Sequence, residues 1–263
     1  MGDKIYPLKR FGQNYLVDKN IVKKIIEEFK PEKEDVVLEI GPGTGALTAE
    51  LVNKVKRFIA VEIDKRAVRQ LKEKFPSLEI VNKDFLEVNL SEFVNKNKKL
   101  RIIGNIPYNI TSPILFKLIY ERKFVKDALL MVQYEVAKRI TAKEGTKDYG
   151  ILSVLLNYFA QTKLCFKISP NVFYPKPKVY SAIIQIIFND EEQKEIDDDL
   201  FIKVVKAAFG NRRKVLKNSF SNSIFRTINF TNNESLTNLL TKRAEDLSIK
   251  DFVQLYEFIK SQL

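Results

Sequence analysis

Short apolar runs that alternate with helical patterns constrain the fold of most of this 263-residue chain. The runs have the length of strands, and the patterns between them repeat apolar residues at helical spacing. Strands that alternate with helices form βαβ units, which build a mostly parallel sheet with helices on both faces. We therefore expect an α/β fold with strands near residues 35–41, 57–64, 78–84, 99–105 and 127–133.

The chain changes character near residue 190. A helical pattern at 149–163 leads into a β-rich stretch that ends with the apolar run 180–188, and the charged segment 189–199 follows. After that segment only helical patterns occur, at residues 201–220, 234–247 and 249–262. We expect two domains, a sheet domain at 1–190 and a small all-helical C-terminal domain at 191–263, joined by this charged linker.

Composition limits the chemistry and the partners. The formal charge of +12 favours a polyanionic partner such as nucleic acid. The chain has no histidine and one cysteine, Cys165, so it lacks the commonest metal ligand and general base, and we expect no metal. It has no apolar run of about 18 residues, and its first ten residues lack the apolar core of a secretory signal. We expect a cytoplasmic protein without membrane contact.

A glycine-rich loop, GPGTG at residues 41–45, follows the first expected strand and opens a helix. Glycines there permit tight turns and let a ligand approach the backbone, although a dinucleotide-binding enzyme would use a similar pattern. Glu62 ends the second strand, where a carboxylate accepts hydrogen bonds from ribose hydroxyls, and Asp84 ends the third, where it would meet an adenine edge. The carboxyl ends of parallel strands share one edge, so we expect a cofactor site there.

The fourth strand ends in GNIPYNIT, residues 104–111. Pro107 favours a stiff loop, which carries an amide, free carbonyls and an aromatic ring. The Asn105 side-chain oxygen and the carbonyl of Ile106 or Pro107 would accept hydrogen bonds from an exocyclic amine of adenine, and the Tyr108 ring would stack on the base. A nicotinamide enzyme needs no such clamp, whereas an amine methyltransferase does. We therefore take Asn105 and Tyr108 as candidate catalytic residues.

Nine stretches carry a resemblance to a known family. They are FGQNYLVD (11–18), LEIGPGTGALT (38–48), VEID (61–64), NKDF (82–85), GNIPYNIT (104–111), MVQYEVAKRI (131–140), YGILSVL (149–155), VFYPKPKVYSAII (172–184) and AFGNRRKVLKNSF (208–220). Together they resemble the ribosomal RNA adenine N6,N6-dimethyltransferases, and the small-subunit enzymes in particular.

The resemblance implies a Rossmann-like methyltransferase sheet that uses S-adenosyl-L-methionine. It implies cofactor contacts from Asn14, Leu16, Gly41, Glu62, Asp84 and Asn105. It also implies that Asn105 and Tyr108 hold the target adenine and that Phe173 helps to sandwich it. An aromatic face restores stacking that a flipped base has lost.

The segment 206–218 holds five basic residues and no acidic one. On a helix with its apolar residues turned inward, some of these charges would share an outer face. A solvated surface is the ordinary explanation for such a run, but the match to the family's C-terminal motif favours RNA binding, by Arg212, Arg213 and Lys214.

The expected function is N6,N6-dimethylation of two adjacent adenosines near the 3′ end of small-subunit ribosomal RNA, with a role in small-subunit biogenesis. We expect a monomer whose substrate is that RNA within a pre-assembled subunit. Two alternatives remain: a large-subunit methyltransferase of the antibiotic-resistance type, and a ribosome-assembly factor without catalytic activity.

Overall fold

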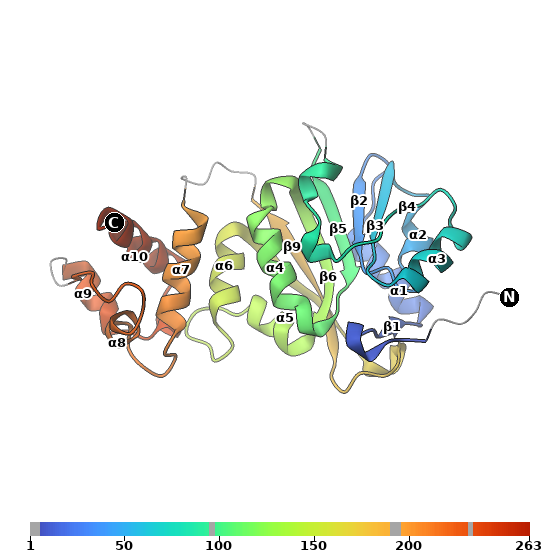
Figure 1. Ribbon diagram of the computed structural model, residues 1–263. Coiled ribbons are helices and arrows are strands. Elements are labelled where there is room, and N and C mark those ends of the chain that lie inside the picture. Colours follow the sequence, from blue (N-terminus) through green and yellow to red (C-terminus); the bar gives the residue numbers. More distant parts are fainter. Residues whose placement is uncertain (1–5, 95–97, 190–195, 231–233) are drawn as a thin grey trace. The chain divides into compact units, whose positions relative to one another are not determined.

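The computed structural model describes residues 6–94, 98–189, 196–230 and 234–263 (Figure 1). Contacts divide the chain into two compact units. The first comprises residues 1–137 and 163–188, and the second comprises residues 138–162 and 189–263. The domain boundary expected at residue 190 lies in 190–195, outside the described residues. Residues 138–162 group with the C-terminal helices, an association that no pattern in the sequence predicts.

A seven-stranded sheet organises the first unit, in the order β4-β3-β2-β5-β6-β9-β7. Strands β2 to β6 run parallel to one another, and β9 runs antiparallel to β6. The predicted mostly parallel sheet is thereby confirmed. The strands are β2 (Val36–Ile40), β3 (Arg57–Val61), β4 (Glu79–Val81), β5 (Leu100–Asn105), β6 (Val125–Gln133), β7 (Ala160–Ile168) and β9 (Ser181–Phe188).

A separate two-stranded sheet joins segments far apart in the sequence. It pairs β1 (Tyr15–Leu16) with β8 (Phe173–Tyr174), so that Tyr15 lies opposite Tyr174 and Leu16 opposite Phe173. The pairing holds the segment that precedes the sheet against the segment that enters β9.

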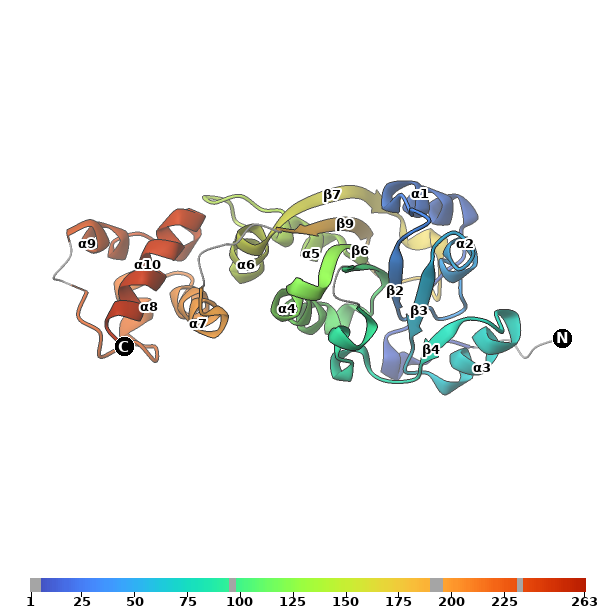
Figure 2. The same ribbon diagram turned by 90° about the horizontal axis from the view of Figure 1, so that it is seen from above.

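Helices cover both faces of the large sheet, as the alternating pattern predicts, and α1 and α4 lie on opposite sides of it (Figure 2). Helix α1 (Lys19–Phe29) is an addition to the expected elements. It begins where the Asp18 carboxylate caps the amides of Asn20 and Ile21, and it ends at Lys30 in the left-handed conformation. Its apolar face packs into the core beneath the sheet. The other helices of this part are α2 (Thr48–Leu51), α3 (Lys65–Lys74), α4 (Thr111–Tyr120) and, spanning both units, α5 (Tyr134–Ile140).

The second unit is helical and is built around aromatic side chains. The Phe201 ring lies 6.1 Å from the Phe159 ring and 5.8 Å from the Tyr256 ring, centroid to centroid. Edge-to-face contacts of this kind stabilise a core by more than the burial of their surface area alone would. Its helices are α6 (Ile151–Phe159), α7 (Asp198–Phe209), α8 (Leu216–Ser221), α9 (Glu234–Leu240) and α10 (Ile249–Ser261).

The expected single helix at 201–220 is wrong. Helix α7 ends at Phe209, and α8 begins at Leu216. Between them, Val215 forms a β-bridge with Arg243, and the Leu216 amide donates to the Lys242 carbonyl at 2.9 Å. The backbone groups there bond across to another segment, which interrupts the helical ladder.

The helix expected at 149–163 is shorter than the pattern suggested. Helix α6 ends at Phe159, and Ala160 starts strand β7, which contains Cys165. Among the described residues, none of the helices has the length and apolar character needed to cross a bilayer.

Candidate active site

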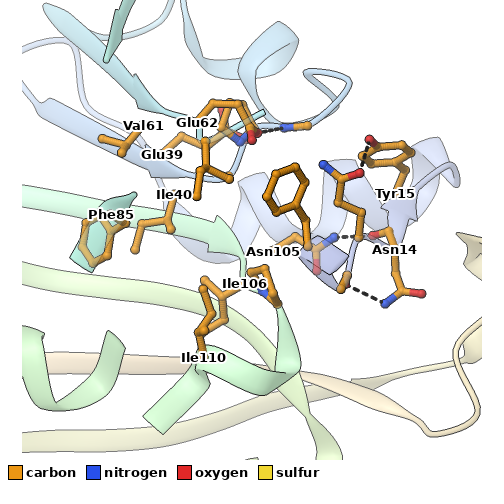
Figure 3. Close-up of a pocket in the computed structure, with 18 of the residues that line it drawn as sticks. Asn14, Tyr15, Glu39, Ile40, Val61, Glu62, Phe85, Asn105, Ile106 and Ile110 are labelled. Atoms are coloured by element: carbon orange, nitrogen blue, oxygen red, sulfur yellow. Dashed lines mark hydrogen bonds between the residues drawn. The ribbon is translucent and has the colours of Figure 1, made fainter. Parts of the chain in front are cut away.

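A pocket of about 260 Å³ opens at the carboxyl edge of the parallel strands (Figure 3). Its walls come from the carboxyl ends of β2, β3 and β5, from the loops that follow β2, β3, β4 and β5, and from the segment 10–16. Seven of the residues singled out in the sequence line it: Asn14, Leu16, Gly41, Glu62, Asp84, Asn105 and Tyr108. The strand-end arrangement thus brings together side chains up to 94 positions apart, from Asn14 to Tyr108.

The glycine loop has the backbone conformation that its sequence predicts. Gly41 and Gly43 have φ values of +63° and +55°, a region that residues with a side chain rarely adopt. A Cβ at Gly43 would lie 2.9 Å from the Tyr15 ring, whereas a Cβ at Gly41 would meet nothing within 4 Å. A side chain at position 43 would therefore clash with Tyr15, which requires glycine there. At Gly41, by contrast, the backbone is open to the pocket.

Glu62 is a buried carboxylate, 4% exposed, at the end of β3. Its two oxygens accept hydrogen bonds from the amides of Gly43, at 3.0 Å, and Asp64, at 2.9 Å. Burial raises its pKa, and these two amides oppose that rise. Each carboxylate oxygen has a further lone pair, so Glu62 can still accept hydrogen bonds from a ligand in the pocket.

Glu39 is a second buried acid of the pocket, which the sequence reasoning missed. It lies within β2, is 2% exposed, and accepts a hydrogen bond from the Thr48 hydroxyl. Its pKa is raised from 4.5 to about 8, mainly by burial and to a smaller extent by the nearby Glu62 charge, while the Thr48 hydrogen bond opposes the rise. The sequence did contain a signal for this residue. Glu39 is a lone acid inside the apolar run 36–40, and buried parallel strands are normally apolar throughout.

Asp84 lines the pocket from the loop that follows β4, beyond the end of that strand at Val81. One of its carboxylate oxygens accepts from the Leu86 amide at 2.9 Å and caps a 3₁₀ turn at Phe85–Glu87. The local bond fixes the side chain, and the second oxygen retains its capacity to accept.

Asn105 is the last residue of β5, and its side-chain amide nitrogen donates to the Asn14 carbonyl at 2.8 Å (Figure 3). A backbone carbonyl only accepts, so this contact determines which end of the amide is nitrogen and which is oxygen. The Asn105 oxygen is then directed away from the Asn14 carbonyl and remains an acceptor.

The same loop contains two backbone carbonyls that the sequence did not distinguish. The Pro107 carbonyl accepts from the Ile110 amide at 3.2 Å and from the Thr111 hydroxyl at 3.4 Å. Within the described residues, no protein donor reaches the Ile106 carbonyl. Ile106 therefore offers the more available acceptor beside Asn105. Thr111 is the first residue of α4, and Ile110 is its N-cap.

Tyr108 is half-buried in the pocket wall, and burial raises the pKa of its phenol. Its hydroxyl is 2.8 Å from the hydroxyl of Ser181, a fully buried residue at the start of β9. The contact fixes the ring at one end and leaves its face as part of the lining.

Gln13 organises the segment 8–15 around the pocket. Its side-chain oxygen accepts from the Leu8 amide at 2.8 Å and the Tyr15 hydroxyl at 2.9 Å, while its nitrogen donates to Asp64 at 3.2 Å. Asp64 is itself held by Arg66, which lowers the pKa of that carboxyl to about 2. The motif FGQN contains this residue, but long-range partners cannot be read from a motif.

Phe173 does not line the pocket. Phe173 is 4% exposed, belongs to the core cluster that also contains Leu16, and is not part of the pocket lining. The neighbouring Tyr174 is 56% exposed. The structure therefore does not bring the Phe173 ring to the pocket in this conformation.

Arg212 belongs to the second unit and is engaged within it. It forms an ion pair with Glu245 at 3.1 Å and donates to the carbonyls of Lys147 and, at 3.2 Å, Tyr149. Arg213 and Lys214 are exposed. All three expected RNA-binding residues are thus exposed, and Arg212 in addition makes these contacts within its own unit.

Comparison with known proteins identifies the family. The family model described as ribosomal RNA adenine dimethylase matches residues 8–261. A protein of Chlorobium phaeobacteroides named ribosomal RNA small subunit methyltransferase A is 44% identical over 96% of this chain and 91% of its own length. A protein of the same name from Caldanaerobacter subterraneus subsp. tengcongensis is 41% identical over 94% of this chain and 95% of its own.

Solved structures agree with this assignment. A dimethyladenosine transferase from Plasmodium falciparum superposes with a TM-score of 0.80 at 27% identity, covering 94% of this chain and 98% of its own. The 23S rRNA methyltransferase ErmE superposes with a TM-score of 0.67 at 25% identity, covering 94% and 100%. The chain belongs to the ribosomal RNA adenine dimethylase family.

Proposed function

We propose that this chain transfers methyl groups from S-adenosylmethionine to N6 of adenosines in small-subunit ribosomal RNA, twice on each base. Membership of the family makes it a methyltransferase that uses S-adenosylmethionine and acts on adenine of ribosomal RNA. The small subunit is supported by the names of the most similar relatives and by the higher TM-score with the dimethyladenosine transferase than with the 23S enzyme.

The pocket fits the cofactor that the family uses. The open backbone at Gly41 allows close approach of a ligand, and the buried Glu62 carboxylate has acceptor capacity left for two ribose hydroxyls. We assign Asp84 to the adenine amine, and Asn14, Leu16 and Asn105 to the remainder of the molecule. When bound, S-adenosylmethionine supplies an electrophilic methyl group.

The orientation of Asn105 is the observation that carries the chemical proposal. The adenine amine is a poor nucleophile because its nitrogen lone pair is delocalised into the ring. Its two N–H groups can donate to the Asn105 side-chain oxygen and to the Ile106 carbonyl, which hold the amine in one orientation. Two acceptors placed in this way localise the lone pair on nitrogen and direct it into the pocket.

Tyr108 supplies the wall against which the base would lie. Its hydroxyl is held by Ser181, so the ring is oriented before any substrate arrives. A fixed aromatic face is worth about 1–3 kcal/mol to a base removed from its own stack. The proposed division of work is that Asn105 and Ile106 orient the amine while Tyr108 orients the ring.

The finer features of the substrate extend this proposal. We propose two adjacent adenosines near the 3′ end of the RNA, presented by a partly assembled small subunit, and a monomeric enzyme in the cytoplasm. The names of the relatives support small-subunit RNA as the substrate, and the formal charge of +12 supports a polyanionic partner. The exposed residues Arg213 and Lys214 are proposed RNA contacts.

The test compares three RNAs as acceptors of labelled methyl groups. Purified protein is incubated with naked small-subunit RNA, with small-subunit particles or with large-subunit RNA. We expect label at two adjacent adenosines of the small-subunit RNA, and more in particles than in naked RNA. Label confined to large-subunit RNA would favour the resistance-type activity, and no label in any RNA would favour a non-catalytic assembly factor.

The matched variants are Asn105→Ala and Asn171→Ala. Asn171 is an exposed asparagine outside the pocket lining, so its loss should leave the label unchanged. Loss of label with Asn105→Ala alone would assign the activity to this pocket and not to a contaminant.

A further inference from the structure

We propose that Tyr180, with Lys167 and Tyr134 beside it, forms a stacking platform for an unpaired RNA base that flanks the target adenosine. The proposal rests on the proposed function, since it concerns how the same pocket receives its RNA. The platform is defined as Tyr134, Lys167 and Tyr180, three side chains from the ends of three adjacent strands.

The platform is built around one cation between two rings. The Lys167 ammonium lies 3.9 Å from the centroid of the Tyr180 ring and 4.6 Å from that of the Tyr134 ring. The Tyr134 amide donates to the Tyr180 carbonyl at 2.9 Å, which extends the β6–β9 ladder by one residue pair. The two tyrosines are therefore held side by side by backbone bonds, independently of their side chains.

The platform lies at the same edge of the sheet as the pocket. Tyr134 follows the carboxyl end of β6, and Tyr180 precedes the amino end of β9, which is antiparallel to β6. Tyr180 is also next in sequence to Ser181, whose hydroxyl contacts the Tyr108 hydroxyl. An RNA strand whose adenine lies on Tyr108 would thus have its neighbouring nucleotides near Tyr180.

Exposure distinguishes Tyr180 from an aromatic that fills a core. The residue is 49% exposed, although its chain neighbour Ser181 is fully buried. The preceding segment places two exposed lysines, Lys176 and Lys178, between the exposed rings of Tyr174 and Tyr180. Aromatic faces interleaved with cations suit a single strand, because bases stack on the rings and phosphates pair with the cations.

Charge favours RNA over another protein as the occupant. Lys167, Lys176 and Lys178 are exposed cations on a chain with a formal charge of +12, which attracts a polyanion from a distance. A ring that contacts an ammonium can still offer the rest of its surface to a base, and the ammonium can reach a phosphate. The structure thus combines the two contacts that sequence-tolerant binding of unpaired RNA requires.

The experiment measures stacking directly. The probe is a single-stranded RNA with two adjacent adenosines and the fluorescent base 2-aminopurine at a flanking position, titrated with the full-length protein. Stacking quenches 2-aminopurine, so we expect quenching with the wild type and with Tyr180→Phe, which keeps the ring. Tyr180→Leu should lose the quenching and bind the RNA about five-fold more weakly or worse.

A matched control is Tyr120→Leu, because Tyr120 is 45% exposed and ends α4 at the opposite edge of the sheet. It should bind as the wild type does, and melting curves of all variants should coincide. Equal quenching by Tyr180→Leu and the wild type at every flanking position would overturn the platform.

The enzymatic readout separates this proposal from the proposed function. Tyr180→Leu should raise the RNA concentration for half-maximal rate while the rate at saturating RNA and the affinity for S-adenosylmethionine stay unchanged. Normal methylation with unchanged RNA dependence would refute the platform alone. Absence of methylation by the wild type would refute the proposed function, and the quenching titration would still test the platform.

Discussion

Glu62 combines a charge with nearly complete burial, and both determine what its substitution should do. Glu62→Gln keeps the shape of the side chain but replaces one accepting oxygen by a donor, which would face the amide of Gly43 or Asp64. Hydrogen bonds to a charged group contribute about 1.5–3 kcal/mol, so the affinity for S-adenosylmethionine should fall about ten-fold or more. Isothermal titration calorimetry measures this directly.

Glu50→Gln is the matched control for Glu62, because Glu50 is an acid of α2 with a partly exposed side chain, paired with Lys54 at 3.6 Å. It should bind the cofactor with wild-type affinity. Unchanged affinity in Glu62→Gln would remove Glu62 from the cofactor site.

Glu39 predicts how stability depends on pH. Burial raises its pKa from 4.5 to about 8, so the folded protein holds the proton more tightly than the unfolded chain does. Stability should therefore fall as pH rises from about 4.5 to about 8 and change little from this group above that. Glu62, whose pKa is also raised, acts in the same direction, whereas Asp64, with a pKa of about 2, titrates below this range.

Glu39→Gln cannot ionise, so its melting temperature should fall less steeply across that range. Thermal denaturation of the cofactor-free protein at pH values from about 4.5 to about 9 measures both curves. Parallel curves for Glu39→Gln and the wild type would show that Glu39 titrates normally and is not neutral in the folded protein.

At the scale of elements, the turn between α7 and α8 holds basic residues for which we expect two different effects on substitution, one on stability and one on RNA binding. Arg212→Ala should lower the free energy of unfolding by about 1 kcal/mol, because Arg212 ties that turn to the carbonyls of Lys147 and Tyr149. Urea denaturation tests this, and a variant as stable as the wild type would contradict the structural role of Arg212.

Arg213→Ala combined with Lys214→Ala should leave stability unchanged and weaken RNA binding. Each phosphate contact to unpaired RNA contributes about 0.7 to the slope of log affinity against log salt, so two lost contacts should flatten the slope by about 1.4. Binding titrations at several salt concentrations measure it. An unaltered slope would indicate that these two residues are ordinary solvated surface residues and do not contact RNA.

Elements with a strong local signal were predictable from the sequence. Buried parallel strands are near-continuous apolar runs, so β2, β3, β5 and β6 could be placed close to their observed bounds. Helix α1 had such a signal in its Asp18 cap and amphipathic pattern and was nevertheless missed. The two-residue strands β1 and β8 have no periodicity, because only their mutual pairing defines them.

For the whole molecule, the strand-end rule accounts for most of the pocket and for its limits. It placed Gly41, Glu62, Asp84 and Asn105 at one edge because parallel strands must share it. It could not find the contacts of Asn14 with Asn105 or of Ser181 with Tyr108, which join positions 91 and 73 residues apart. The roles of these residues in binding and catalysis stay predictions.

The central claim is that the Asn105 pocket dimethylates adenine in small-subunit RNA, and one measurement tests it most directly. Small-subunit particles are incubated with S-adenosylmethionine and either wild-type protein or Asn105→Ala, and the RNA is digested to nucleosides for mass spectrometry. We predict N6,N6-dimethyladenosine with the wild type and at least about 100-fold less with Asn105→Ala, whose melting curve stays close to that of the wild type. Equal amounts of dimethyladenosine from the two proteins, or none from the wild type, would contradict the claim.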